Sequence, residues 1–191
     1  MPTRRGAAGG NAVPSRHTPD PGVKRTGSAA LFAVLVSLTG AGCAGAPRVI
    51  SYYVDRGIMQ YYLVPSGFRG DHASLDLDIT VRIGDQAAPP AICNFTIKDR
   101  DLPRAVLEAR FELIDLDTTL QLRDFAVLYV ERSRSEIRLT STMDLGSVRE
   151  LLRSRDLRLQ VRTDGREYLF TPSARFYKII GDAAIEIIDE P

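Results

Sequence analysis

The sequence predicts an all-β fold, a two-layer antiparallel β-sandwich with one short helix, preceded by a signal segment. Apolar and polar residues alternate with a period of two along several stretches, which places one face of each strand in a core and the other in water. Turn-forming residues separate these stretches at short intervals, which favours antiparallel neighbours in two packed layers. The first 43 residues differ from the rest in composition and charge. A β-barrel is the second architecture that the pattern allows.

The most regular strands are predicted where the alternation is uninterrupted, at residues 74–83, 105–113 and 157–162. The apolar residues expected on their core faces are Leu75, Leu77, Ile79, Val81, Ile83, Ala105, Leu107, Ala109, Phe111, Leu113, Leu157, Leu159 and Val161. Less regular stretches are predicted as further strands, namely Met59–Val64, Ala91–Ile97, Phe125–Val130, Glu136–Thr142, Glu167–Phe170, Arg175–Ile180 and Ala184–Ile188.

Local signals predict one hairpin and one helix. Asp164-Gly165 is typical of a two-residue hairpin turn because both positions tolerate a positive φ. A helix is expected from about Leu145 to Arg155, where Ser147 and Glu150 have the spacing of a capping box. Its short apolar stripe consists of Val148, Leu151 and Leu152.

Composition excludes several classes of protein. Apolar residues make up 44% of the 191 and charged residues 26%, which indicates a folded core rather than disorder. The net charge of +1 lacks the electrostatic footprint of a dedicated nucleic-acid binder, so no nucleic acid is expected as a partner. Two cysteines and two histidines favour neither a disulfide scaffold nor a zinc site.

The N-terminal segment has the three parts of a secretory signal. Lys24 and Arg25 precede an apolar run from Ala29 to Leu38, and small residues follow it up to Cys43. The run is half the length of the roughly 20 apolar residues that cross a bilayer as a helix. The segment 38–43, Leu-Thr-Gly-Ala-Gly-Cys, resembles the lipobox of bacterial lipoproteins, although Gly40 stands where that motif usually has leucine.

The resemblance implies that the Cys43 thiol receives a diacylglyceryl group and that this residue becomes the new N-terminus. The competing cleavage site, Ala44-Gly45-Ala46, leaves Pro47 first, and proline fits an extended cleavage register poorly. Two or more acyl chains anchor a protein stably to a membrane, at about 0.8 kcal/mol per buried methylene. If Cys43 is exported without a lipid, a disulfide with Cys93 is the alternative, although Cys93 is expected to be a buried apolar thiol.

The predicted organisation is a signal segment at 1–42, a tether at 43–48 and one β-sandwich domain at 49–191. Translation from Val23 is a further hypothesis, because it gives the signal an ordinary length and omits a stretch rich in proline and glycine. The protein is expected to be exported and held in the bacterial cell envelope.

Two groups of side chains are candidate binding residues. The four arginines Arg149, Arg153, Arg158 and Arg162 lie in a stretch with an excess of positive charge, and guanidinium groups suit anionic headgroups or cell-wall polymers. The alternative is that they occupy solvated faces of the helix and a strand. Tyr52 and Tyr53 begin a tyrosine-rich region and are candidates for an interface, with ordinary edge or core packing as the alternative.

The sequence marks out no catalytic or metal site. The carboxylate pairs Asp76/Asp78, Asp99/Asp101 and Asp115/Asp117 have residue types that hold Ca²⁺ or act as acid and base, but they are expected on solvated faces or in turns. His72 stands alone after the signal segment, and neither a nucleophile elbow nor a phosphate loop occurs. The prediction is therefore no metal, no cofactor and no enzyme activity.

These observations favour a membrane-anchored envelope lipoprotein that acts as a non-catalytic binding or scaffold module. Its expected partners are the bilayer, through acylated Cys43, and an envelope protein or anionic polymer. A carrier of a small apolar ligand or lipid is the alternative, and it requires a cavity of roughly several hundred Å3. A carbohydrate-active enzyme that uses carboxylates is the second alternative.

Overall fold

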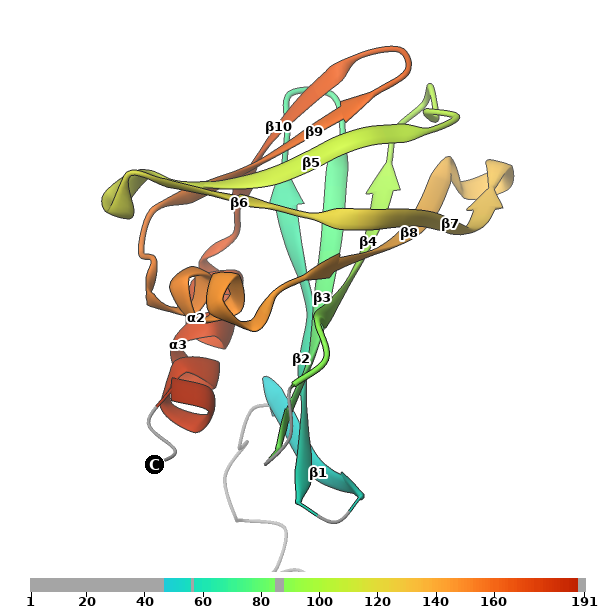
Figure 1. Ribbon diagram of the computed structural model, residues 1–191. Coiled ribbons are helices and arrows are strands. Elements are labelled where there is room, and N and C mark those ends of the chain that lie inside the picture. Colours follow the sequence, from blue (N-terminus) through green and yellow to red (C-terminus); the bar gives the residue numbers. More distant parts are fainter. Residues whose placement is uncertain (1–46, 56, 85–87, 189–191) are drawn as a thin grey trace, which may run out of the picture. The chain divides into compact units, whose positions relative to one another are not determined.

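The computed structural model describes residues 47–55, 57–84 and 88–188, which form ten strands and two α-helices (Figure 1). The strands are β1 (Val49–Asp55), β2 (Ile58–Arg69), β3 (Ser74–Gly84), β4 (Ala91–Lys98), β5 (Val106–Leu113), β6 (Thr118–Gln121), β7 (Arg123–Glu131), β8 (Glu136–Met143), β9 (Leu157–Thr163) and β10 (Glu167–Pro172). The α-helices are α2 (Leu145–Arg153) and α3 (Ala174–Ile188), and two short 3-10 turns are η1 (Ile114–Leu116) and η2 (Arg132–Arg134).

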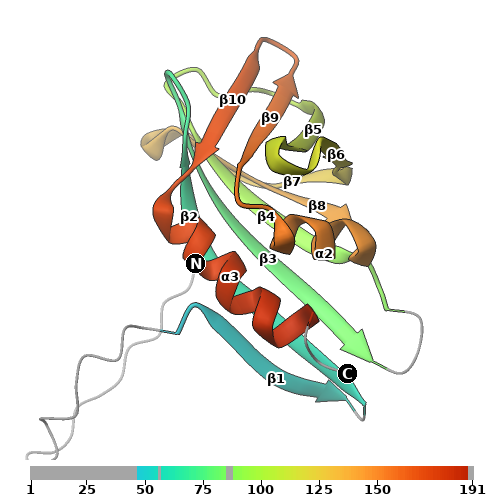
Figure 2. The ribbon, with the colours of Figure 1, turned by 90° about the vertical axis from the view of Figure 1, so that its left-hand side faces the viewer.

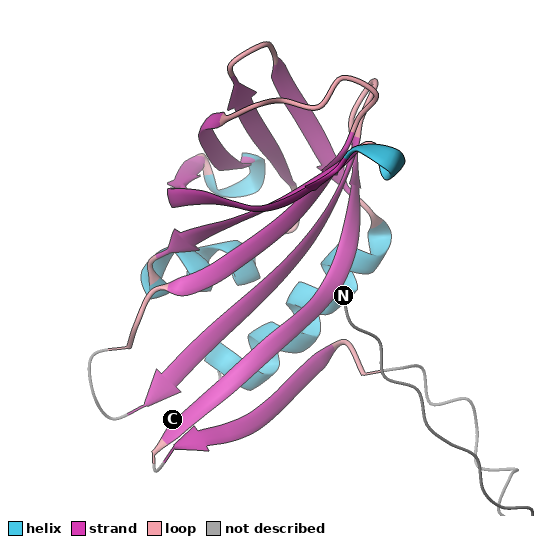
Figure 3. Ribbon diagram, turned by 90° about the vertical axis from the view of Figure 1, so that its right-hand side faces the viewer, coloured by secondary structure: helices cyan, strands magenta, loops and turns pink. Residues whose placement is uncertain are grey.

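The strands form one antiparallel sheet that nearly closes into a barrel. Its order is β6-β5-β9-β10-β2-β3-β4-β8-β7, with β1 added along β2 (Figures 1 and 3). β6 and β7 lie at opposite ends of this order although only Leu122 separates them in sequence. The Leu122 amide still donates to the Ala109 carbonyl oxygen on β5, at 3.0 Å, and the chain beyond it pairs with β8. One nearly continuous segment therefore joins both ends of the sheet.

The all-β prediction is confirmed, and the arrangement differs in detail from a two-layer sandwich. Asp124, at the start of β7, has a φ of 55°, and the register of β7 against β8 shifts between Arg123 and Ala126. A bulge of this kind bends a strand and strengthens its twist. Because of this bend, the segment pairs with β5 before Leu122 and with β8 after it. Alternation in the sequence does not reveal such a change of neighbouring strand.

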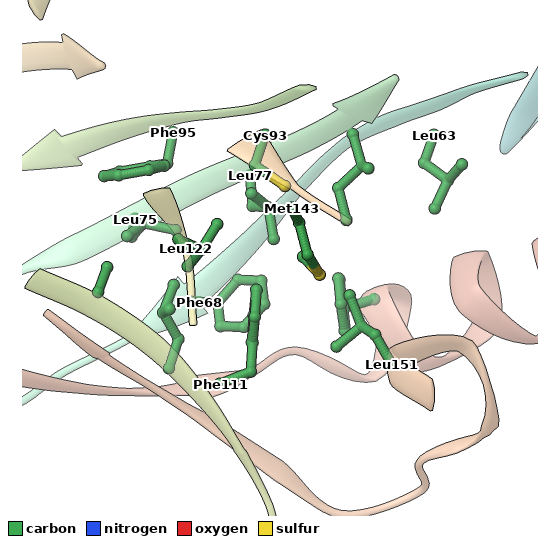
Figure 4. Packing of buried hydrophobic residues seen from close by; sticks show 14 of the residues in the cluster. Leu63, Phe68, Leu75, Leu77, Cys93, Phe95, Phe111, Leu122, Met143 and Leu151 are labelled. Carbon is green, nitrogen blue, oxygen red and sulfur yellow. The ribbon is translucent and has the colours of Figure 1, made fainter. Parts of the chain in front are cut away.

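The barrel core is filled by large side chains from opposite strands. Figure 4 shows Phe68, Phe95, Phe111 and Met143 among the side chains of this core, together with Leu151 of α2. The alternation predicted for β3 is confirmed, since the residues buried on it include Leu75, Leu77, Ile79 and Val81. Leu107 is an exception and is 56% exposed, because the pairing of β5 with β9 shifts register between Val106 and Glu108.

The C-terminal segment is helical, so the strands predicted at Arg175–Ile180 and Ala184–Ile188 are wrong. These residues form α3, which lies along β2 (Figure 2). The buried residues of α3 recur every three or four positions and are Phe176, Ile179, Ile180, Ala183 and Ile187. That period matches a helix, and the Phe176 ring meets Phe68 of β2 edge-on with centroids 4.7 Å apart. The prediction failed because each apolar run, read separately, is short enough to be a strand.

The helix predicted from about Leu145 to Arg155 is confirmed as α2, but its N-cap is Asp144. The Asp144 carboxylate accepts hydrogen bonds from the Ser147 amide at 2.8 Å and from the Ser147 hydroxyl at 2.7 Å. The predicted capping box, with Ser147 as the cap, is therefore displaced by three residues. Val148, Leu151 and Leu152 are buried, as predicted. Neither α2 nor α3, the α-helices of the described residues, combines the length and apolar composition needed to cross a membrane.

The hairpin predicted at Asp164-Gly165 is confirmed, since β9 pairs with β10 across it. Neither turn residue has a positive φ, so the turn is of another type than predicted. The Thr163 amide closes it by donating to the Arg166 carbonyl at 2.9 Å, and the Thr163 hydroxyl donates to the same carbonyl at 2.8 Å and accepts from the Arg166 amide at 3.2 Å. The threonine side chain thus reinforces the backbone closure of the turn.

Candidate binding surfaces

The four candidate arginines do not form one cluster. Arg149 and Arg153 are exposed on α2, whereas Arg158 and Arg162 are exposed on β9. The Arg162 guanidinium forms an ion pair with Glu108 at 2.8 Å, and no acidic partner is found for the other three among residues 47–55, 57–84 and 88–188. Arg153 lines a groove between α2 and α3.

This groove has a volume of about 520 Å3 and combines an apolar floor with a basic rim. Leu152, Ile180, Ala184 and Ile188 contribute apolar surface, and Arg153 and Arg155 contribute the charge. Arg155 was not among the candidate residues predicted from the sequence. The signal that marks it is its position just beyond the end of α2, two residues after Arg153, where the chain leaves the helix.

The turn that carries Arg155 is held by Asp115. The Ser154 hydroxyl donates to one Asp115 carboxylate oxygen at 2.6 Å, and the Arg155 amide donates to the other at 2.7 Å. These hydrogen bonds, that of Ser154 first, hold the pKa of the Asp115 carboxyl below its ordinary value. The carboxylate therefore fixes the backbone of the groove rim.

Tyr52 and Tyr53 lie on β1, which pairs with β2 along one side. Tyr53 is 75% exposed, and the Tyr52 hydroxyl contacts the side chain of Gln60. Ile50 and Val54 on the same strand are also exposed. The predicted interface candidates thus belong to an apolar edge strand, while Tyr61 of the same tyrosine-rich region is buried in the core.

A second exposed apolar strand is β7, which was predicted as a strand at Phe125–Val130 but not as an exposed one. Four consecutive residues, Val127, Leu128, Tyr129 and Val130, are each between 45% and 53% exposed. Val127 and Val130 pair with Leu139 and Ile137 of β8, which are buried, so their side chains share the face of the barrel interior and are nevertheless uncovered. An apolar run with no alternation is the signal that was available, but such runs are typical of central strands.

One end of β7 opens onto a second groove, with a volume of about 500 Å3. Val130, Leu102 and Pro103 supply its apolar surface, and Arg100, Arg104 and Arg132 also line it. The apolar run Val127–Val130 of β7 therefore ends beside a group of arginines.

The carboxylate pairs take part in structural contacts. Asp78, expected on a solvated face, is only 2% exposed, and this expectation is wrong. It accepts from Arg138 at 2.6 Å and from Asn94 at 2.9 Å, because it lies on the middle strands of the sheet with neighbours on both sides. Asp76 pairs with Lys98 at 2.8 Å.

Asp99 and Asp101 both bind Arg166, at 3.1 and 3.2 Å. The Tyr168 hydroxyl donates to Asp99 at 2.8 Å, and burial, followed by this hydrogen bond, raises the pKa of Tyr168 to about 12. Within the part of the chain that the structure describes, no three histidine, cysteine or acidic side chains are grouped to hold a metal ion.

Of the two cysteines, only Cys93 lies among the described residues. It is a free, buried thiol, as expected, and burial raises its pKa to about 12. Cys43 and the whole predicted signal segment lie outside the described residues. Comparisons of the chain with family models, with curated proteins and with solved structures found no match.

Proposed function

We propose that this protein is an exported lipoprotein of the bacterial envelope whose β-barrel domain binds another envelope protein without catalysis. The observation that carries the binding role is the run of four exposed apolar residues, Val127–Val130, on β7. Fully burying an exposed apolar side chain contributes about 1.5–3 kcal/mol, and these side chains are about half exposed, so a partner that covers the strand gains roughly half of that for each residue. Contiguous exposed apolar surface on a folded domain is typical of an interaction site.

The geometry of β7 supports one mode of contact over another. Two register shifts, between Arg123 and Ala126 and between Val127 and Tyr129, interrupt its pairing with β8. Bulges of this kind protect an edge strand from indiscriminate pairing. The proposed contact is therefore made through the apolar side chains rather than by simple extension of the sheet.

The other exposed strand, β1, is suited to a position close to the membrane. Five residues separate Cys43 from Val49, so an extended chain of six residue steps spans at most about 20 Å between the proposed acyl anchor and β1. Tyr52 and Tyr53 carry an apolar ring and a polar hydroxyl, which suits a boundary between water and lipid.

The alternatives receive less support. An enzyme needs carboxylates free to transfer protons, whereas Asp78 and Asp99 are buried against arginines. A carrier inside the barrel needs space that Phe68, Phe95 and Phe111 fill, so an apolar ligand would have to use a groove outside the barrel.

Membrane fractionation tests the anchor. The wild-type chain is expected in the membrane pellet after a carbonate wash, and the Cys43→Ser variant in the soluble fraction. If both variants are soluble, or if both remain bound, the lipid anchor is wrong.

Site-specific photocrosslinking in the producing cell tests the binding strand. A crosslinker at Leu128 is expected to yield one discrete protein adduct, which is lost when Val130→Asp is introduced into the same chain. A crosslinker at Arg158, exposed on β9, is the matched control and should give no such adduct. Absence of an adduct at Leu128, or the same adduct from Arg158, contradicts the proposal.

A further inference from the structure

We propose that the groove between α2 and α3 binds a single anionic amphiphile, with its carboxylate or phosphate head on Arg153 and Arg155 and its acyl chain along α3. This site lies apart from β7 and adds a second binding activity to the proposed function. Four features of the groove support this assignment, namely its apolar floor, its basic rim, its rigidity and its size.

The apolar floor is a second stripe on α3. One stripe, which includes Phe176 and Ile187, faces the core, and the other lines the groove from Tyr177 to Ile188. At about 1.5 Å per residue this second stripe is roughly 16 Å long, which suits an extended acyl chain. Ile185 beside it is 67% exposed. Gly181 lies within the stripe, and a Cβ built there meets nothing within 4 Å, so the missing side chain leaves the groove open.

The basic rim consists of two arginines whose guanidinium groups form no ion pair with an acid of the described residues. Arg153 and Arg155 line the groove, and none of the other described lining residues is acidic. The carboxylate nearest in the hydrogen-bond network is Asp115, whose two oxygens accept from Ser154 and from the Arg155 amide. Guanidinium groups bind carboxylate and phosphate oxygens through paired donors, so an anionic head complements this rim.

The rim and floor are held rigidly with respect to each other. The Leu157 amide donates to the Tyr177 hydroxyl at 3.3 Å, which ties the chain after α2 to α3. Leu152 is buried at the contact between the two helices. A preorganised groove loses less conformational freedom when a ligand binds.

Size and shape favour one amphiphile over a bilayer surface. A volume of about 520 Å3 lies within the usual range of small-molecule sites. The groove is concave between two helices, so it receives one chain lengthwise, whereas a flat bilayer would touch only its rim. The occupant is therefore a monomeric lipid with one acyl chain and an anionic head.

Isothermal titration calorimetry tests this assignment with the full chain in a Cys43→Ser background, so that no attached acyl chain competes. The probes are lysophosphatidylglycerol and lysophosphatidylcholine of equal chain length, each below its micelle concentration. The anionic lipid is expected to bind more tightly. The double variant Arg153→Gln/Arg155→Gln should weaken its binding about tenfold or more and weaken binding of the zwitterionic lipid less, because the choline cation offsets the charge of the phosphate that both lipids carry.

Two further variants make the result specific. Arg149→Gln/Arg158→Gln removes the same charge from exposed positions outside the groove and should keep wild-type affinity. Gly181→Leu fills the floor and should weaken binding of both lipids about tenfold or more. Thermal unfolding shows that each variant remains folded.

Three outcomes overturn the assignment: equal affinity for the two lysolipids, equal losses in the groove and control variants, or full binding by Gly181→Leu. Binding only to phosphatidylglycerol vesicles, without saturable binding of the monomer, also overturns it and identifies a bilayer contact instead. Crosslinking at Leu128 is unaffected by these variants, so the two proposals fail separately.

Discussion

Arg138 forms a 2.6 Å ion pair with Asp78 on the outward side of the barrel, where the Asp78 side chain is almost fully buried. Arg138 also donates to Thr96 at 3.0 Å, and Asn94 donates to the other Asp78 oxygen. The pair thus joins β3, β4 and β8 through side chains as well as through their backbone ladder.

Replacing Arg138 with alanine should destabilise the fold by about 2–3 kcal/mol, because it leaves the buried Asp78 carboxylate with only a neutral donor. The loss stays below that of a fully buried pair since the guanidinium is partly solvated. Urea unfolding measures it. Lys98→Ala, which breaks the exposed pair with Asp76, is the control and should cost less than about 1 kcal/mol. Equal costs for the two variants would contradict the structural role of Asp78.

The cap of α2 should make stability depend on acidity. The Ser147 amide, then the Ser147 hydroxyl, hold the pKa of the Asp144 carboxyl below its ordinary value. Its contribution is therefore complete above about pH 4, the ordinary pKa of an unfolded aspartate, and disappears as the pH falls through the lower pKa of the folded state.

Asp144→Ala should cost about 1 kcal/mol near neutral pH and less in acid. Thermal unfolding across this pH range measures the difference. Glu150→Ala is a suitable control, because the observed cap does not use Glu150. If Glu150→Ala lowers stability more than Asp144→Ala does, the result would support the capping box predicted from sequence instead.

Tyr168 should ionise at a higher pH in the native protein than in the unfolded chain. Burial, and then the hydrogen bond to Asp99, raise its pKa to about 12, compared with about 10 in an unfolded chain. The neutral phenol therefore contributes stability that is complete below about pH 10 and is lost as the pH rises through 12. Alkaline titration of tyrosinate absorbance measures this step. In Asp99→Asn the step should move to lower pH while remaining above the ordinary value, and an unchanged step would exclude Asp99 as a cause.

Leu128 and Leu139 lie on paired strands and should respond oppositely to substitution. Leu128 on β7 is exposed, so Leu128→Gln should change the free energy of unfolding by no more than about 0.5 kcal/mol. Leu139 on β8 is buried, and Leu139→Ala should cost about 2–5 kcal/mol. Urea unfolding of the isolated chain compares them. A large loss for Leu128→Gln would mean that β7 is covered within a single chain.

Strand positions were predictable where one face is buried and the other is wet, as on β3. There the period of two follows from the geometry of the strand itself and needs no knowledge of its neighbours. The same rule failed at α3, since Phe176 and Ile179 belong to a helical period that becomes visible only when both apolar runs are taken together. It failed at Leu107 because a register shift is a property of two strands and not of one.

The candidate arginines illustrate the same limit. The sequence indicated that Arg149, Arg153, Arg158 and Arg162 are exposed, and the structure places all four at the surface. The sequence could not indicate that Arg153 and Arg155 line the same groove while Arg162 forms an ion pair with Glu108. That distinction depends on residues from distant parts of the chain.

Taken alone, the sequence determined the all-β class, the helix α2, the hairpin at Asp164-Gly165 and the burial of Cys93, since each follows from local period or turn chemistry. The tertiary structure decided the near closure of the barrel at Leu122, the exposure of β7 and the groove beside α3. These depend on which surfaces meet in space, and a surface is buried or exposed only with respect to neighbours that the chain brings to it by folding.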